Sequence, residues 1–65
     1  MEKEKPLISI IILNYNAGDL IFNCINSVFQ TKYENYEVIL VDNISTDGSH
    51  KKCKEHFDKI QLIEN

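Results

Sequence analysis

The sequence lacks an excess of basic charge, long hydrophobic runs and more than a few glycines or prolines. It has two Gly and one Pro in 65 residues, and its formal net charge is −3. A nucleic-acid-binding protein needs a basic face for the phosphates, and none is visible here. The longest apolar runs, Ile10–Leu13 and Val38–Val41, are far shorter than the roughly 20 residues of a membrane span. The charged stretch Met1–Lys5 precedes no long apolar region, so we expect no signal peptide, no transmembrane segment and no nucleic-acid partner.

The residue sets of most catalytic and metal sites are also missing. Cys24 and Cys53 lack the short spacing of zinc ligands or of a redox pair. We interpret them as buried thiols of a cytoplasmic protein, with a disulfide between them as the alternative. His50 lies three residues before Cys53, but two ligands do not make a metal site, and we expect this histidine to be partly exposed. No pair of acids has a spacing typical of general acid–base catalysis, so no catalytic residue is predicted.

The apolar segments predict an α/β fold with the order β-α-β-α-β. The three expected strands are Leu7–Leu13, Glu37–Val41 and Ile60–Ile63. Continuous rather than alternating hydrophobicity is typical of parallel strands that are covered on both faces. We therefore predict a parallel sheet with strand order 3-2-1. Residues 1–6 are predicted to be a disordered tail, and residues 7–65 to be the amino-terminal part of a larger domain.

Two helices are expected between these strands. In the first, the apolar residues recur every three or four positions, which predicts a buried stripe. The stripe consists of Leu20, Ile21, Cys24, Ile25, Val28 and Phe29. Asp19 is a candidate N-cap, and Phe22 lies off the stripe. The second helix is predicted to run to about Phe57, and Asp47 is expected to cap it rather than to bind a metal.

Right-handed crossovers place both helices on the same face of such a sheet. The opposite face would then expose half of the apolar strand residues, which a soluble monomer rarely does. We expect either the rest of a longer protein or a second copy of this chain to cover that face.

Polar and aromatic residues follow the first two strands, at Asn14–Asn16 and at Asp42 and Asn43. The carboxyl ends of neighbouring parallel strands are where open α/β sheets bind ligands. Tyr15 could stack against a flat base, and Asp42 could accept hydrogen bonds from a ribose hydroxyl or a base N–H. The structural alternatives are a packed loop aromatic and a turn aspartate. The loop after the first strand has Gly18 as its single glycine, so the glycine-rich fingerprint of dinucleotide sites is absent.

Three segments together resemble the start of a family-2 glycosyltransferase of the GT-A fold. They are Ile8–Asn16, Ser27–Tyr33 and Tyr36–Ser49. The resemblance covers nearly the whole chain from Leu7 onward, but only about the first third of such a catalytic domain. It departs from the family at Leu13 or Asn14, where Pro is frequent, and at Ile44, where Gly or Asn is frequent.

The resemblance implies a nucleotide-sugar donor and inverting transfer of its sugar to an acceptor hydroxyl. It implies that Tyr15 lies against the base, that Asp42 hydrogen-bonds to the base, and that Asn14 and Asn43 line the pocket. It also implies a divalent metal, Mg²⁺ or Mn²⁺, that neutralises the departing diphosphate. The donor sugar, the acceptor saccharide or lipid, and any association with a membrane in the full-length protein stay open.

The chain has no Asp-x-Asp motif, which members of the family use to bind the metal. We therefore expect this chain to supply the nucleotide-binding half of the site, to bind no metal alone and to be inactive alone. One alternative is a non-catalytic α/β module that forms a homodimer through the bare sheet face. Another is a Rossmann-like domain for a different nucleotide.

Overall fold

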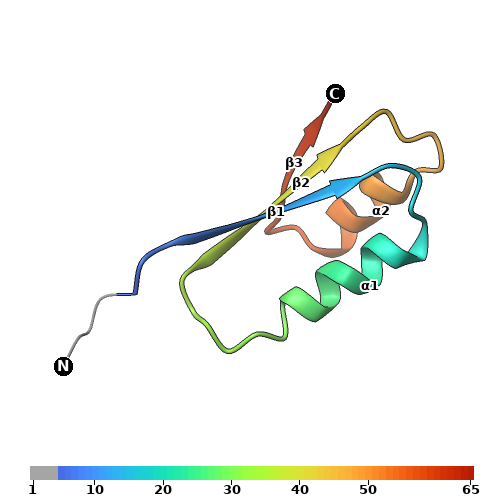
Figure 1. The fold of residues 1–65 in the computed structure, drawn as a ribbon. Helices are drawn as coiled ribbons and strands as arrows, with labels where there is room; N and C mark the ends of the chain where they lie inside the picture. The colour runs from blue at the N-terminus through green and yellow to red at the C-terminus, as the bar shows by residue number, and fades with distance from the viewer. Residues whose placement is uncertain (1–4) are drawn as a thin grey trace.

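The computed structural model describes residues 5–65 as a three-stranded sheet packed against two helices (Figure 1). The elements are β1 (Ile8–Asn14), α1 (Asp19–Val28), β2 (Tyr36–Asp42), α2 (Ser49–His56) and β3 (Gln61–Glu64). β2 lies between β1 and β3 and is parallel to both, so that the order across the sheet is β1-β2-β3. The predicted α/β class, element order and parallel sheet are confirmed.

The amino-terminal segment lies against the loop that precedes β2. The predicted disordered tail covers residues 1–6, of which residues 1–4 lie outside the described residues. Lys5 forms an ion pair with Glu34, with 3.3 Å between Nζ and Oε1. The hydroxyl of Tyr33 donates a hydrogen bond to the carbonyl oxygen of Pro6.

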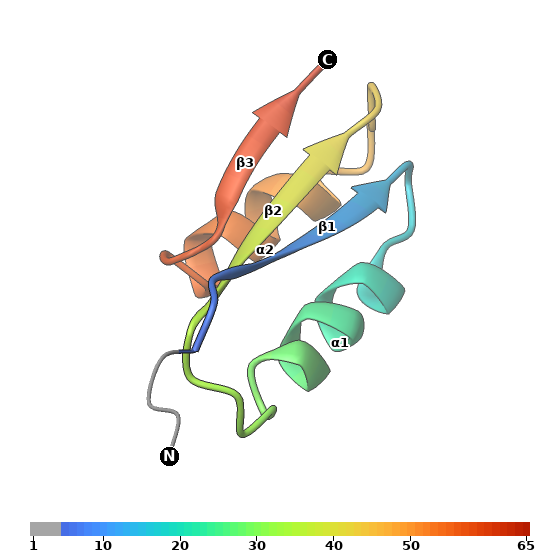
Figure 2. The same cartoon turned by 60° about the vertical axis from the view of Figure 1, so that its left-hand side comes forward.

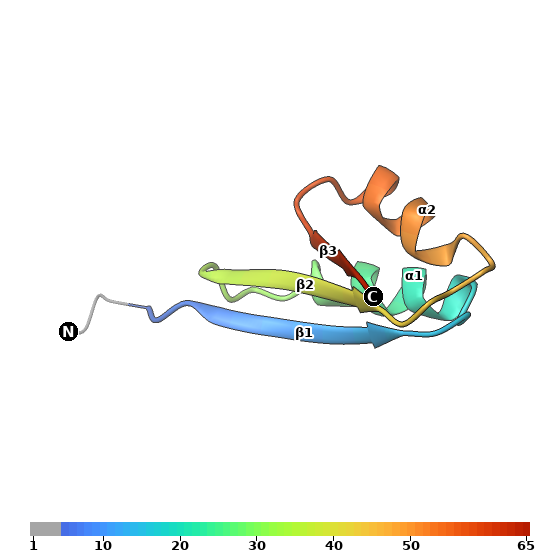
Figure 3. The ribbon, with the colours of Figure 1, turned by 90° about the horizontal axis from the view of Figure 1, so that it is seen from above.

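Both helices cover the same face of the sheet, which Figures 2 and 3 show from two directions. The core lies between this face and the helices because side chains alternate across a strand. Its buried members are Ile21, Ile25, Val38, Leu40, Cys53 and Ile60. Neither helix of the described chain is long and apolar enough to cross a bilayer.

The other face of the sheet carries an exposed apolar surface, as predicted. The register places Leu13, Val41 and Ile63 in one row across the three strands, and Ile11 beside Ile39 in the next row. Leu13, Ile11 and Ile63 are 76%, 63% and 49% exposed, respectively. We call these five residues the open-face patch.

The buried stripe of α1 differs from the prediction. Leu20 and Cys24 are exposed, whereas Phe22 is half-buried and its ring lies 5.0 Å from that of Phe57 and 4.8 Å from that of His56. The physical reason is that α2 packs beside α1, so that the face toward α2 is covered as well as the face toward the sheet. Helix α1 also starts differently from the prediction, because Gly18 and not Asp19 occupies the N-cap position.

Candidate functional site

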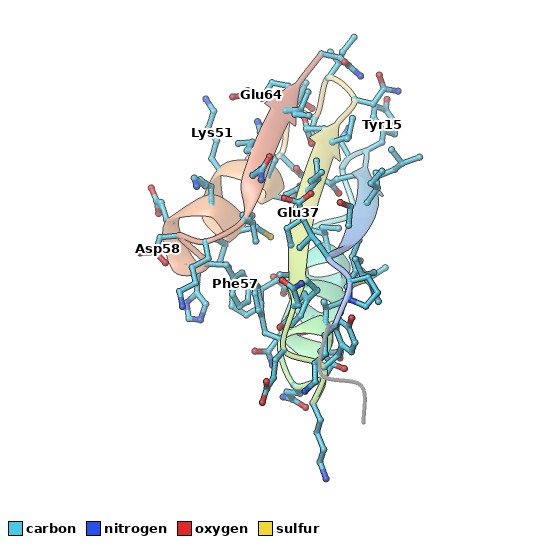
Figure 4. All side chains as sticks on the ribbon, turned by 90° about the vertical axis from the view of Figure 1, so that its left-hand side faces the viewer. Tyr15, Glu37, Lys51, Phe57, Asp58 and Glu64 are labelled. Carbon is cyan, nitrogen blue, oxygen red and sulfur yellow. The ribbon has the colours of Figure 1, made fainter. Side chains whose placement is uncertain are left out.

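The four predicted nucleotide-binding residues lie together at the carboxyl ends of β1 and β2. Asn14 and Asp42 are register partners on adjacent strands, and Tyr15 and Asn43 follow them directly. The alternation of a strand sends consecutive side chains to opposite faces. Asn14 and Asp42 are each 2% exposed on the helix side, whereas Tyr15 is 66% exposed and Asn43 is exposed. Figure 4 shows Tyr15 toward the same end of the molecule as Glu64, where the strands end.

The buried half of the site is a hydrogen-bonded pair. Asn14 Nδ2 donates to Asp42 Oδ1 over 2.8 Å and to Ser49 Oγ over 2.9 Å. Asp42 Oδ1 also accepts from Ser45 Oγ at 2.6 Å, and Oδ2 accepts from Ser45 N at 2.9 Å. Both carboxylate oxygens are therefore engaged by the protein itself.

These hydrogen bonds keep the buried carboxyl ionised. Burial by itself raises the pKa of Asp42, because a low-dielectric surrounding disfavours the charged form. The hydrogen bonds donated by Ser45 and Asn14, together with nearby His50, outweigh that effect and hold the pKa of Asp42 below its ordinary 3.8.

The exposed half of the site is a shallow hollow of about 520 Å³ that includes Leu13 and Val41 of the open-face patch. The residues that line it are Leu13, Asn14, Tyr15, Val41, Asn43 and Asn65. It combines an aromatic ring and aliphatic side chains with carboxamides, which can both donate and accept hydrogen bonds. Such a surface is chemically suited to one face and one edge of a flat heterocycle.

His50 is buried beneath the carboxyl ends of β2 and β3, which corrects the prediction that it is partly exposed. It is 4% exposed, and its Nε2 lies 3.3 Å from Glu64 Oε1 while its Nδ1 lies 3.6 Å from Asp42 Oδ1. Among residues 5–65, Nδ1 has no hydrogen-bond partner. The histidine is buried because the first turn of α2 packs under these strand ends, which no local pattern in a lysine-rich segment indicates.

Asp47 is not the N-cap of α2, which corrects the prediction: Gly48 occupies that position, and Asp47 lies one residue before it. Its Oδ1 accepts from Ser49 N at 2.9 Å and from Ser49 Oγ at 2.6 Å. These two bonds, with a third from Gly18 N, hold the pKa of Asp47 below 3.8 despite some desolvation. Within the described part of the chain, no three His, Cys, Asp or Glu side chains gather where they could hold a metal ion.

Sequence reasoning missed the roles of Ser45, Ser49 and Asn16, all of which make hydrogen bonds within this site. Serine and asparagine are common in loops, so their presence in these two loops carried no signal for contacts between the loops. The φ value of Asn16 is +50°, a left-handed conformation that Asn tolerates better than most residues.

Comparison with known proteins places this geometry in a family. Residues 9–65 match the family described as Glycosyl transferase family 2. One relative is TuaG of Bacillus subtilis (strain 168), assigned as a glycosyltransferase of teichuronic acid biosynthesis. It is 37% identical in an alignment 71 residues long, which covers 100% of this chain and 28% of TuaG. The glucosyltransferase WfgD of Escherichia coli is 38% identical over 60 residues, which cover 91% of this chain and 24% of WfgD.

A solved structure also resembles the fold. It is the mannosyltransferase PcManGT from Pyrobaculum calidifontis in complex with GDP-Man and Mn²⁺, with a TM-score of 0.70 and 25% identity. The match covers 89% of this chain and 18% of PcManGT. The chain thus spans less than a third of the length of each of these relatives.

Proposed function

The chain belongs to glycosyl transferase family 2, and from this we propose that it supplies the base-binding half of a nucleoside-diphosphate-sugar site. The observation that carries the proposal is the hollow at the carboxyl ends of the strands, where the exposed ring of Tyr15 and the carboxamide of Asn43 line one surface. Ligands of open parallel sheets bind at this edge. The complete reaction would be inverting transfer of the sugar to an acceptor hydroxyl.

The four site residues divide into two roles under this proposal. Tyr15 stacks against the base, and Asn43 donates a hydrogen bond to its edge or accepts one from it. Asn14 and Asp42 are buried on the helix side of the sheet, and their side chains form hydrogen bonds within the protein. They therefore support the residues that line the hollow on the opposite side. The direct contact that we expected from Asp42 thereby becomes an indirect one.

A departing diphosphate requires cationic stabilisation, and no lysine is among the described residues that line the hollow. PcManGT is described in complex with Mn²⁺, which supports a divalent metal, Mg²⁺ or Mn²⁺, as the group that neutralises the leaving diphosphate in a complete catalytic domain. The carboxylates of this chain do not fit that task, because they do not assemble into a ligand set within the described residues. No step of the transfer is therefore assigned to them.

Replacing Tyr15 by Ala tests the base-binding proposal. Alanine substitution of a stacked aromatic removes about 1–3 kcal/mol per base, so we expect UDP or GDP to bind the Tyr15→Ala chain at least about fivefold more weakly. Tyr15→Phe keeps the ring and should bind nearly as well as the original chain. The measurement is titration with each nucleotide, followed by amide chemical shifts.

Tyr33→Ala is the matched control, because Tyr33 lies on the loop before β2, at the amino edge of the sheet, and does not line the hollow. Amide signals of Tyr15 and Asn43 that stay in place at millimolar UDP and GDP would refute the proposal.

A second candidate function follows from the open-face patch. Exposed apolar surfaces of this kind mark contact sites, and a non-catalytic module could form a homodimer by pairing two such faces. In either case, we expect the isolated chain to associate as its concentration rises.

Substitution of Ile11 by Lys should shift this association toward the monomer in sedimentation equilibrium, because a charge would be placed in the middle of the apolar contact. Leu20→Lys, on exposed α1, is the control and should leave the association unchanged. A saturable dimer would favour the module, and weak association without a defined endpoint would favour the enzyme half. Equal association of the Ile11→Lys chain and the original chain would exclude the patch as the contact.

A further inference from the structure

The loop that follows β1 and the loop that follows β2 are joined by four hydrogen bonds. Asn16 Oδ1 accepts from Thr46 N at 2.7 Å and from Asp47 N at 3.2 Å. In the opposite direction, Asn16 N donates to Ser45 Oγ over 2.9 Å and Gly18 N donates to Asp47 Oδ2 over 3.1 Å. Each loop therefore satisfies backbone N–H groups of the other, although the two loops are distant in sequence.

The Ser45 hydroxyl connects these bonds to the buried pair below. It donates to Asp42 Oδ1 over 2.6 Å, and its oxygen accepts from Asn16 N at 2.9 Å and from Asn14 Nδ2 at 3.3 Å. The Asn14 amide has two hydrogens with nearer acceptors in Asp42 and Ser49, so its contact with Ser45 is the weakest of the three. The hydroxyl hydrogen of Ser45 and one of its two acceptor sites are used within the protein.

The backbone beside these bonds is held in an unfavourable conformation. The φ of Ile44 is +58°, and for a β-branched residue this left-handed region is a true outlier. Such strain persists only where the surrounding contacts enforce it. Ile44 lies between Asn43, which lines the hollow, and Ser45, which is bonded through both its N–H and its hydroxyl to Asp42. The contacts of Ser45 are thus one restraint on Ile44 and, through it, on Asn43, whose N–H is also bonded to the carbonyl oxygen of Asn14 at 2.9 Å.

We propose that Asn16, Ser45 and Asp47 are positioning residues that hold the Tyr15 ring and the Asn43 carboxamide at a fixed separation. We call these three residues the loop clasp. Tyr15 directly precedes Asn16, and Asn43 lies two residues before Ser45, so each ligand-contacting side chain is anchored by its neighbour. The clasp atoms bond to other groups of the protein, and the importance of the clasp for binding rests on the proposed base-binding role of Tyr15 and Asn43.

The first test needs no ligand. In Ser45→Ala, we expect the amide order parameters of Tyr15 and Asn43 to fall from about 0.85, typical of rigid backbone, toward about 0.6, and the amide of Asn16 to exchange faster with solvent. Helix content by circular dichroism should stay the same. Ser27→Ala is the matched control, because Ser27 is exposed on α1 and takes no part in the clasp. Unchanged order at Tyr15 and Asn43 in Ser45→Ala would overturn the proposal.

The second test measures affinity for UDP. We expect Ser45→Ala to bind UDP about tenfold more weakly, and Ser45→Thr, which keeps the hydroxyl, to recover most of the loss. Asn16→Gly keeps the left-handed backbone accessible but deletes the Oδ1 acceptor, so it should weaken binding in the same direction. Equal affinity of the original chain and Ser45→Ala would count against the clasp. If the original chain does not bind UDP, the base-binding proposal fails, and the ligand-free test still decides whether the clasp orders the two loops.

Discussion

Replacing Asp42 by Ala is expected to lower the free energy of unfolding by about 3 kcal/mol, because it leaves several buried polar groups without partners. Asn14 Nδ2, Ser45 N and Ser45 Oγ each donate to this carboxylate, and His50 lies beside it. A domain of this length has about 3–10 kcal/mol of stability in total. The substitution should therefore remove between about a third and nearly all of that stability, seen as a lower midpoint of urea denaturation.

Asp42→Asn keeps the shape but replaces one acceptor oxygen by a donor, so its loss of stability should be smaller than that of Asp42→Ala. Asp58→Ala, at an exposed position, controls for the removal of an acidic side chain and should change stability by less than about 0.5 kcal/mol. If the Asp42→Ala chain were as stable as the original chain, the buried hydrogen bonds would contribute nothing to the stability of the fold.

The same substitution should alter the acid sensitivity of the fold. The folded-state pKa of Asp42 lies below 3.8, so its carboxylate stabilises the fold at and above that pH, and this contribution disappears as the pH falls through the lower, folded value. The stability difference between the original chain and Asp42→Ala should shrink below about pH 4. A difference that stays constant down to pH 2 would contradict this assignment.

Replacing Leu40 by Ala is expected to cost about 3 kcal/mol, comparable with the loss at Asp42. Leu40 is 0% exposed on the helix side of β2, in a core that also contains Ile25 and Ile60. The truncated side chain leaves a cavity that the neighbouring strands and helices fill only in part. Urea denaturation should show a lower midpoint with little change in slope.

Leu13→Ala provides the contrast, because the same change is made in an equally apolar strand. Leu13 is 76% exposed on the open-face patch, so its loss should change the stability of the monomer by less than about 0.5 kcal/mol. Equal losses at Leu13 and Leu40 would mean that the open face is covered in solution, as it would be in a dimer.

The local pattern of apolar and polar residues was enough to predict the strands and helices, and the edge of the sheet at which the candidate site lies. The apolar runs Leu7–Leu13 and Val38–Val41 are uninterrupted except at Ser9, and each is followed by polar residues. Parallel strands bring their carboxyl ends together, so the proximity of the Asn14 and Asp42 positions followed from topology. Among the failures are Phe22 and His50, where burial depends on how α2 packs against elements that are distant in the chain.

The amino-acid sequence alone determined the α/β class, the parallel strands, the existence of one bare apolar face and the resemblance to a glycosyltransferase. These features depend on hydrophobic periodicity and short motifs, which are local properties of the chain. Only the tertiary structure decided that Asp42 faces the helices while Asn43 and Tyr15 face the hollow. The runs of β1 and β2 are apolar on both sides, so the sequence contains no alternation to identify the covered face. The bonds between the two loops were likewise decided by packing, because they join residues that meet only after the sheet has formed.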